Sequence, residues 1–281
     1  MRHAKHLKSK LAAGFAALAL SFGAHATIID LFSTDQGPYQ DINPNSADTG
    51  LLVTSGVGGS VGLADPTILG GNRDMFVSLL DNNVGGAPLA PTISRSVTMA
   101  VGGGVMDFST NTLTAGRGQI QWDGANATNA IDFTGLGGIN LGTGNILLDI
   151  IFSDAGFNFH ITIYTDATHW TDISFTSSAH SVPATTAIPL AAFSNAALCG
   201  TDPADPGVGL ITCGSGGAAN TANVGAIVAD IDPLGGSTSI DLTLDSVTTV
   251  PEPGTLALLG LGLLGLGFGG LGRRRNSVSV A

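Results

Sequence analysis

The central part of this 281-residue sequence contains no lysine and no glutamate. From Thr27 to Val250, twenty aspartates stand against three arginines, which gives this segment a net charge of −17. Nucleic acids and anionic lipid surfaces need lysine and arginine to replace their counterions, so this charge excludes both as partners. Because lysine and glutamate favour helices while aspartate favours turns, the composition also predicts a fold with little helix.

The sequence also lacks short motifs of several enzyme classes. It contains no HExxH zinc motif and no P-loop. Carboxylate pairs suited to glycoside hydrolysis could be drawn anywhere among twenty aspartates, so their abundance carries no information. We therefore expect a protein that is not an enzyme, with a secreted hydrolase as a remote alternative.

The first 26 residues have the pattern of a secretory signal peptide. Residues 1–10 hold four basic side chains and no acidic one, and residues 11–23 are almost wholly apolar or small. This apolar run is too short for a lasting membrane span. Ala24 and Ala26 supply a small-x-small cleavage pattern. We expect the Sec machinery to export the chain and signal peptidase to cleave after Ala26, which leaves Thr27 as the first residue.

Cysteine is scarce, and both cysteines, Cys199 and Cys213, lie in the part expected to be exported. Two cysteines in an oxidising compartment are usually bridged, and this bridge would close a loop of about 15 residues worth roughly 3 kcal/mol. The alternatives are free thiols or metal ligands. Since two ligands without a nearby histidine make a poor zinc site, we predict the disulfide.

The C-terminus has three parts in a fixed order, followed by a tail at residues 276–281. They are a Pro-x-Pro motif, a Leu- and Gly-rich stretch at residues 254–272, and a basic cluster, that is, Pro251, Glu252 and Pro253 and then Arg273, Arg274 and Arg275. A helix over the stretch would span about 28 Å, close to the thickness of a bilayer core. Arginines stay cytoplasmic, so we predict a single transmembrane helix that leaves the body outside the inner membrane.

The order of these three parts at residues 250–275 resembles the PEP-CTERM sorting signal of Gram-negative bacteria. The resemblance implies that an exosortase, a membrane enzyme with a cysteine nucleophile, recognises and cleaves the chain near Pro251, Glu252 and Pro253. It also implies delivery to the cell surface or to an exopolysaccharide matrix after a transient stay in the inner membrane with the body in the periplasm.

The body, residues 27–249, reads as short apolar runs separated by turn residues. In the run from Phe157 to Tyr164, apolar and polar side chains alternate with period two, which is typical of half-buried antiparallel strands. The expected strands cover residues 28–32, 51–53, 74–80, 93–101, 118–122, 146–152, 157–164, 170–175, 186–193, 224–230 and 239–247. We expect residues 146–152 to form a central strand covered on both faces. So many short strands predict an all-β, jelly-roll-like antiparallel β-sandwich.

Two further features concern the organisation of the body. The Gly-rich residues 135–144 are either a long loop or a linker between two lobes, and we favour one continuous sandwich. The order of three short motifs, Arg73-Asp74, Gln121-Trp122-Asp123-Gly124 and Ile188-Pro189-Leu190, resembles that of secreted jelly-roll domains of the carbohydrate-binding type. This resemblance is an analogy of fold, which does not transfer function.

Two kinds of binding residue stand out in the body. Aspartates at turns could supply oxygen ligands for calcium, and the candidates are Asp202, Asp205, Asp230 and Asp232. Their alternative role is that of ordinary turn residues. Exposed aromatic rings can stack on sugars. Of the two tryptophans, Trp122 alternates with polar residues and is expected in the core, whereas Trp170 follows a turn and is the candidate for glycan stacking.

These features lead to two main hypotheses for the exported body. The first is a structural or adhesive protein of the cell surface or of an exopolysaccharide matrix. The second is a carbohydrate-binding module of the jelly-roll type on the same route. Retention on polysaccharide gels separates them.

Overall fold

Strands dominate the computed structural model, which describes residues 26–42, 51–55, 65–81, 95–125, 130–203 and 208–251. They form two seven-stranded antiparallel sheets. Sheet A runs in the order β11 (Ala184–Pro189), β8 (Asn145–Ser153), β14 (Asp241–Val250), β6 (Val105–Thr110), β5 (Val97–Gly102) and β2 (Gln36–Asp41), and β1 (Thr27–Asp30) also pairs with β14. Sheet B runs in the order β12 (Ile211–Cys213), β10 (Trp170–Ser177), β9 (Phe157–Tyr164), β13 (Ala226–Ile231), β7 (Ala115–Trp122), β4 (Arg73–Asp81) and β3 (Leu51–Ser55).

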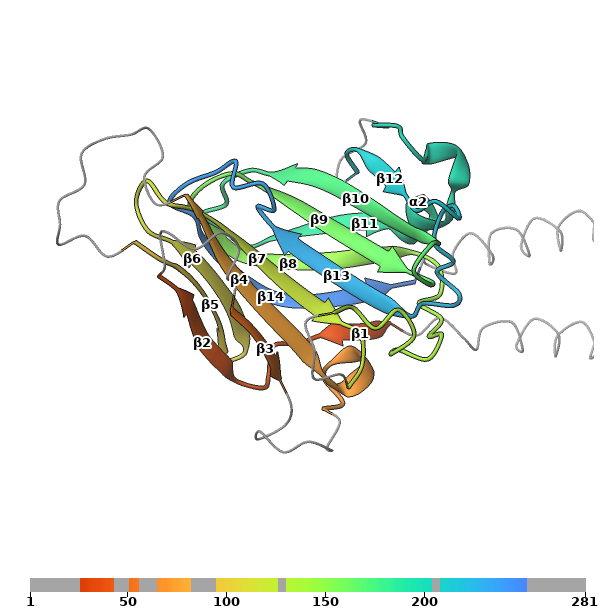
Figure 1. Ribbon diagram of the computed structural model, residues 1–281, viewed down its shortest axis with the longest axis horizontal. Coiled ribbons are helices and arrows are strands. Elements are labelled where there is room, and N and C mark those ends of the chain that lie inside the picture. Colours follow the sequence, from red (N-terminus) through yellow and green to blue (C-terminus); the bar gives the residue numbers. More distant parts are fainter. Residues whose placement is uncertain are drawn as a thin grey trace, which may run out of the picture. The chain divides into compact units, whose positions relative to one another are not determined.

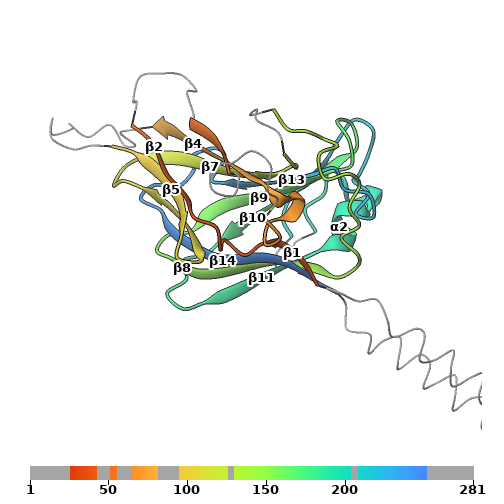
Figure 2. The same ribbon diagram turned by 90° about the horizontal axis from the view of Figure 1, so that it is seen from below.

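The two sheets lie as two layers within the unit Ala26–Val250 (Figures 1 and 2). Sheet B is nearer the viewer in Figure 1, and sheet A lies behind it. The helical segments in the described residues are short, namely η2 (Leu69–Gly71), α2 (Leu190–Ser194) and η3 (Ala196–Leu198). The predicted all-β antiparallel sandwich is therefore confirmed.

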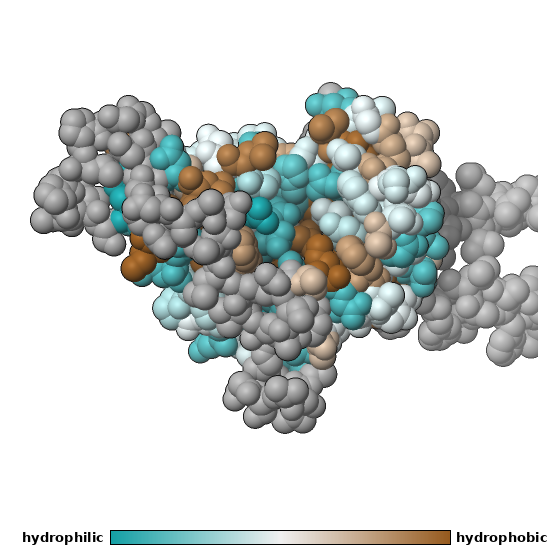
Figure 3. All heavy atoms as spheres, viewed as in Figure 1, coloured by the Kyte–Doolittle hydropathy of each residue, from teal (hydrophilic) through white to brown (hydrophobic). Residues whose placement is uncertain are grey.

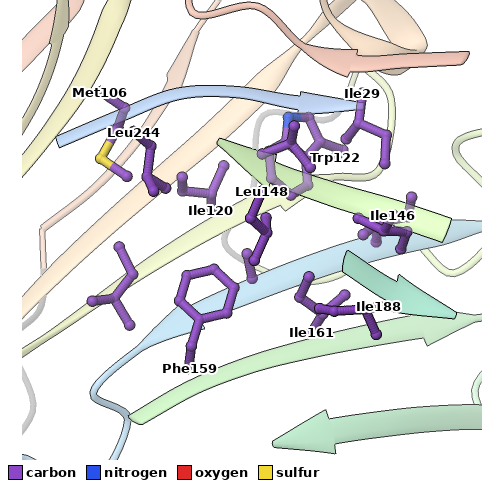
Figure 4. Close-up of a cluster of buried hydrophobic side chains, with 14 of the residues drawn as sticks. Ile29, Met106, Ile120, Trp122, Ile146, Leu148, Phe159, Ile161, Ile188 and Leu244 are labelled. Carbon is purple, nitrogen blue, oxygen red and sulfur yellow. The ribbon is translucent and has the colours of Figure 1, made fainter. Parts of the chain in front are cut away.

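The core lies between the sheets, where apolar side chains from both layers meet (Figure 4). Phe159 and Ile161 of β9 and Ile120 of β7 point into it from sheet B, and Leu148 of β8 and Leu244 of β14 from sheet A. Along β9, buried residues alternate with half-exposed ones at positions 157–161, as the period-two pattern predicted. Each strand therefore turns every second side chain outward, and these outward residues form the outer faces of the sandwich.

Several details of the predicted strands need correction. The predicted strand at residues 186–193 ends at Pro189 and continues as α2, because the following residues Leu190, Ala191 and Ala192 are good helix formers. Strand β8 is central, but its outer residues remain half-exposed, so the predicted cover on both faces is wrong. Strands β2, β6 and β12 were not predicted.

The Gly-rich segment at residues 135–144 packs against the sandwich. Leu136 and Leu141 are buried, and the backbone of Ile139 forms an isolated bridge with Val224. The amide of Leu136 also donates to the carbonyl of Gly225. These contacts make the segment a packed loop of the unit Ala26–Val250.

A buried polar network ties the first strand to sheet B. Arg73 donates through Nη1 to both carboxylate oxygens of Asp30, at 2.8 and 2.9 Å, and both side chains are fully buried. Trp122 donates through Nε1 to the same carboxylate, and Arg73 Nε donates to Gln36. The prediction that Trp122 lies in the core is confirmed. Breaking a buried ion pair of this kind costs about 3–5 kcal/mol, because the remaining charge is left without a counterion.

The first and last strands of the unit pair with each other. Thr27 of β1 lies opposite Thr249 of β14, and the Thr27 amide donates to Thr249 Oγ1 at 3.0 Å. The strands thus begin one residue after the predicted signal-peptide site and end one residue before the sorting motif. Both ends of the folded body therefore leave it at the same place.

Candidate functional site

The outward side of sheet B collects aromatic and polar residues from five adjacent strands. We call this side the B face. Residues directly opposite each other in antiparallel strands share a face, and the register places Tyr164 opposite Trp170, and Asp230 opposite both His160 and Gln119. The B-face residues discussed below are Phe76, Arg117, Gln119, Gln121, His160, Thr162, Tyr164, Trp170, Asp172 and Asp230.

Hydrogen bonds join the middle of the B face across strands β9 and β10. Asp172 of β10 accepts from Thr162 Oγ1 at 2.9 Å through one carboxylate oxygen and contacts His160 Nδ1 at 3.0 Å through the other. The side chains of His160 and Asp172 are 27% and 18% exposed. This pair is therefore fixed in position but still open to solvent.

A second set of hydrogen bonds continues across β13 and β7. Gln119 Nε2 donates to Asp230 Oδ1 at 2.8 Å, and Gln121 Nε2 donates to Gln119 Oε1 at 2.8 Å. Gln121 Oε1 is buried without a hydrogen-bond partner among the described residues. Arg117 Nη2 lies 3.9 Å from Asp230 Oδ1, and its guanidinium lies over the ring of Phe76 at 5.1 Å. The middle of the face is thus a row of carboxylate and amide groups beside one arginine.

The ionisable groups of the B face influence one another. The hydrogen bond that His160 donates to Asp172 raises the pKa of His160 above its ordinary value of 6.5; burial opposes this shift, and the charges of Asp172 and Asp230 add to it. Burial raises the pKa of Asp230, and the charge of Arg117 opposes this rise. Burial also raises the pKa of Tyr164, with the charges of Asp230 and Asp172 as further causes. The aromatic and acidic residues therefore belong to one electrostatic cluster.

Three aromatic rings gather at one end of the B face. The ring centroids of Tyr164 and Trp170 are 6.2 Å apart, and those of Tyr164 and Phe133 are 5.2 Å apart. All three side chains are half-buried. Figure 3 views this side of the molecule and shows hydrophilic residues in its middle, flanked by hydrophobic patches. An aromatic end beside a polar centre can pack against an apolar ring surface while it hydrogen-bonds to polar substituents.

The predicted disulfide between Cys199 and Cys213 is present and supports this aromatic end. Cys213 lies on β12 opposite Thr171 of β10, next to Trp170. The amide of Gly214 donates to the carbonyl of Trp170 at 2.9 Å. A Cβ atom at Gly214 would lie 2.7 Å from the indole ring, so only glycine lets the backbone approach Trp170 this closely. The cross-link therefore holds the segment that borders the candidate stacking residue.

The outward side of sheet A, which we call the A face, has a different character. None of its strands contains a lysine or arginine, and its aspartates bond to hydroxyl groups of neighbouring strands. The residues concerned are Asp107 with Thr243, and Asp149 with Thr185 and Ser246, accompanied by Asp241 and Asp245. A pocket of about 230 Å³ lies on this face, lined by residues that include Asp149, Pro183 and Asp245. No aromatic ring lines it.

The four aspartates proposed for calcium have different surroundings. Asp202 is exposed, and Asp205 lies outside the described residues. Asp230 bonds to Gln119 on the B face, whereas Asp232 is buried and accepts the backbone amides of Gly236 and Ser237. In the described part of the chain, no group of three or more histidine, cysteine, aspartate or glutamate residues could hold a metal ion. Calcium binding stays a prediction.

Most residues of the predicted sorting and cleavage sites lie outside the described residues. Ala26 and Pro251 are the outermost described positions, so Ala24, Glu252, Pro253, the stretch 254–272 and the arginines Arg273, Arg274 and Arg275 have no structural description. Among the described residues, no helix has the length and apolar character needed to cross a membrane. The signal peptide and the transmembrane helix remain predictions.

The sequence points to Trp170 as a candidate but not to the residues around it, His160, Tyr164, Asp172 and Gln119. Their alternation with apolar residues placed them on outward faces, but only the strand order brings β10, β9, β13 and β7 side by side. Strand pairing brings these residues together, and the sequence alone does not show which strands pair.

The family model of the PEP-CTERM protein-sorting motif matches residues 249–275. This match confirms the resemblance seen in the C-terminal sequence. The chain is thus an exported protein with a membrane-anchored sorting signal of the kind that exosortases process. No curated protein matches the sequence.

Solved structures similar to this chain include carbohydrate-binding modules. A family 11 module from Clostridium thermocellum, in complex with a β-1,3-1,4-mixed-linked tetrasaccharide, is 13% identical, with a TM-score of 0.38, and the match covers 82% of this chain and 97% of the module. A family 29 module in complex with mannohexaose is 10% identical, with a TM-score of 0.29, and the match covers 62% of this chain and 89% of that one. Likenesses this distant leave the function of the body to be argued from its own residues.

Proposed function

We propose that this chain is an exported, exosortase-sorted protein whose body binds an extracellular glycan through the B face without cleaving it. The observation that supports this proposal best is the meeting of half-exposed aromatic rings and fixed hydrogen-bonding groups on one side of sheet B. Aromatic rings stack on the apolar faces of sugar rings, while carboxylates, amides and imidazoles bond to the hydroxyl groups.

The geometry favours the carbohydrate-binding hypothesis over a purely structural role. A structural body needs no particular residues on its outer faces, and the A face fits that expectation. On the B face, in contrast, Asp172 and Asp230 are each less than a fifth exposed and are fixed by hydrogen bonds. Groups fixed in this way lose little entropy when a ligand binds. Adhesion to a matrix would then follow from glycan binding.

The route of the protein follows from its two ends. The signal peptide would bring the chain to the Sec machinery, and signal peptidase would remove it. The C-terminal stretch would hold the body in the periplasm until the exosortase cleaves near Pro251. The cell surface or an exopolysaccharide matrix, where glycans are abundant, is then the proposed destination.

The proposal is tested by affinity electrophoresis of the mature protein in gels that contain soluble β-glucan, mannan, glycol chitin or the exopolysaccharide of the host. We expect at least one polysaccharide to retard the protein. Trp170→Ala should weaken the retardation by a factor of about 30, equivalent to about 2 kcal/mol, because a stacking tryptophan at a binding site commonly contributes that much.

Phe152→Ala is the matched control, since Phe152 is 39% exposed on β8 of the other sheet. It should leave the retardation unchanged. If no gel retards the wild-type protein, or if both variants lose retardation equally, glycan binding by the B face is rejected.

A further inference from the structure

We propose that the B face prefers glycans with free amino groups over neutral ones and discriminates against glycans with uronic acids. This inference rests on the proposed function and adds the class of glycan. It follows from the position of Asp230, a partly buried carboxylate that lies between the aromatic end and Arg117.

The hydrogen bonds of the two carboxylates differ. Both oxygens of Asp172 are already engaged, one by Thr162 and the other by His160. Asp230 uses only Oδ1, which accepts from Gln119, and no described group hydrogen-bonds to its Oδ2. The 3.9 Å contact with Arg117 is too long for a hydrogen bond. Oδ2 of Asp230 can therefore accept a hydrogen bond from one further charged donor.

Burial makes such a donor favourable. The side chain of Asp230 is 17% exposed, and its burial raises the pKa of the carboxyl group, so the charged form has lost part of its hydration. A hydrogen bond from a neutral hydroxyl group would offset only part of the lost hydration free energy. A protonated amine gives a charge-assisted hydrogen bond, which is roughly twice as strong as a neutral one.

The aromatic end favours the same chemistry. Trp170 lies two residues from Asp172 along β10, and Tyr164 lies four residues from His160 along β9, separations of about 7 and 13 Å in a β-strand. Asp230 lies opposite His160. An oligosaccharide with one ring stacked on the aromatic residues can thus bring the amino group of a following ring to Asp230. Tryptophan and tyrosine rings also attract ammonium groups directly through cation–π interactions.

The same charges oppose uronic acids. Arg117 is the only arginine or lysine on the strands that form the B face apart from the fully buried Arg73. The charges of Arg117 and of protonated His160 only balance those of Asp172 and Asp230, and the body around them has a net charge of −17. A polyanionic glycan would therefore be repelled at long range and would find no surplus of positive charge on the B face.

The test uses three oligosaccharides of equal length and the mature protein isolated from its host. β-1,4-linked glucosamine oligomers and their N-acetylated counterparts share ring and linkage, but only the first have free amines. Galacturonate oligomers supply the negative charge. Titration calorimetry at a pH where the amines are protonated should give an affinity for the glucosamine oligomer about tenfold above that for the acetylated one, a difference of 1.4 kcal/mol. Galacturonate should bind most weakly.

Two Asp→Asn substitutions, each of which removes one negative charge, separate an effect local to Asp230 from general electrostatic attraction to the acidic body. Asp230→Asn on the B face should remove the preference for the free amine, whereas Asp245→Asn on the A face should retain it. All titrations contain a chelator, and a parallel series with calcium tests whether a metal ion takes the place of the amine. Loss of the preference on addition of calcium, in the wild type and in Asp245→Asn alike, would support competition between the metal ion and the amine at Asp230.

The outcomes distinguish the two proposals. Equal affinity for the free and acetylated oligomers, or equal loss in both variants, overturns the amine preference and leaves glycan binding intact. Tighter binding of galacturonate also overturns it. Failure of all three oligomers and of every polysaccharide in the gels rejects the proposed function itself.

Discussion

The A face and the B face are built from the same kinds of strand but differ in how they use polar residues. On the A face, aspartates such as Asp107 and Asp149 bond to threonine and serine hydroxyls of neighbouring strands. On the B face, Asp172 bonds to His160 as well as to a threonine hydroxyl, and Asp230 bonds to Gln119, beside aromatic rings. The A face contains no basic strand residue, whereas the B face contains Arg117.

This difference teaches how an acidic protein can keep one face suited to binding. Aspartates that bond to hydroxyls keep a strongly negative surface, which favours solubility and prevents association. Aspartates held beside an imidazole, amides and aromatic rings give a surface with both apolar and hydrogen-bonding groups. The number of acidic residues does not distinguish the two faces. The hydrogen-bond partners of their aspartates do distinguish them.

The largest expected effect that tests this comparison concerns the disulfide, because this cross-link lies only at the edge of sheet B. The double substitution Cys199→Ser with Cys213→Ser opens a loop whose ends are 14 residues apart. We expect the free energy of unfolding in denaturant to fall by about 3 kcal/mol. Since β12 and Gly214 border Trp170, tryptophan emission of the folded variant should also shift to longer wavelength.

Trp122 is the internal reference for that shift, because it is 1% exposed and bonded to Asp30. Trp170→Phe in the cross-link-free background should abolish the shift. A shift that persists would mean that the core rather than the B face had loosened, which would contradict the local role of the disulfide.

A smaller effect concerns His160, whose contact with Asp172 has no equivalent on the strands of the A face. Its pKa is raised in the folded state by the hydrogen bond that it donates to Asp172, so the protonated histidine stabilises the fold. This contribution is fully present below the unfolded pKa of about 6.5 and is lost as the pH rises through the higher folded value. His160→Gln should therefore cost up to about 1 kcal/mol near pH 5 and close to nothing near pH 9.

The measurement is the difference in melting temperature between wild type and variant across this pH range. His169→Gln serves as the control, since His169 contacts Asp166 in an exposed turn where both side chains are 47% exposed. A penalty for His160→Gln that grows with pH would show that the neutral imidazole is the stabilising form.

Alternating residues such as those of β9 made the sandwich predictable from sequence, because period two marks a half-buried strand. The hairpin of β5 and β6 also left a signal that went unused: Gly103 and Gly104 have positive φ values of 63° and 86°, and Met106 and Phe108 alternate with polar residues. Strand β12 is only three residues long, too short for any pattern.

The candidate site was predictable only in part. Trp170 could be chosen because it follows a turn, and Cys199 with Cys213 because they are the only two cysteines of the sequence. The partners of Trp170 come from strands far apart in sequence, with Gln119 and Asp230 separated by 111 residues. Strand order decides such contacts, and it depends on how the whole core packs.

The most direct test of the B face as the binding surface is covalent footprinting of aromatic side chains, with and without the glycan that the gels retain best. We predict that labelling of Trp170 and Tyr164 falls when the glycan is added, while labelling of Phe152 and Tyr39 on sheet A stays the same. Protection of Phe152 and Tyr39, with Trp170 and Tyr164 unchanged, would contradict the account.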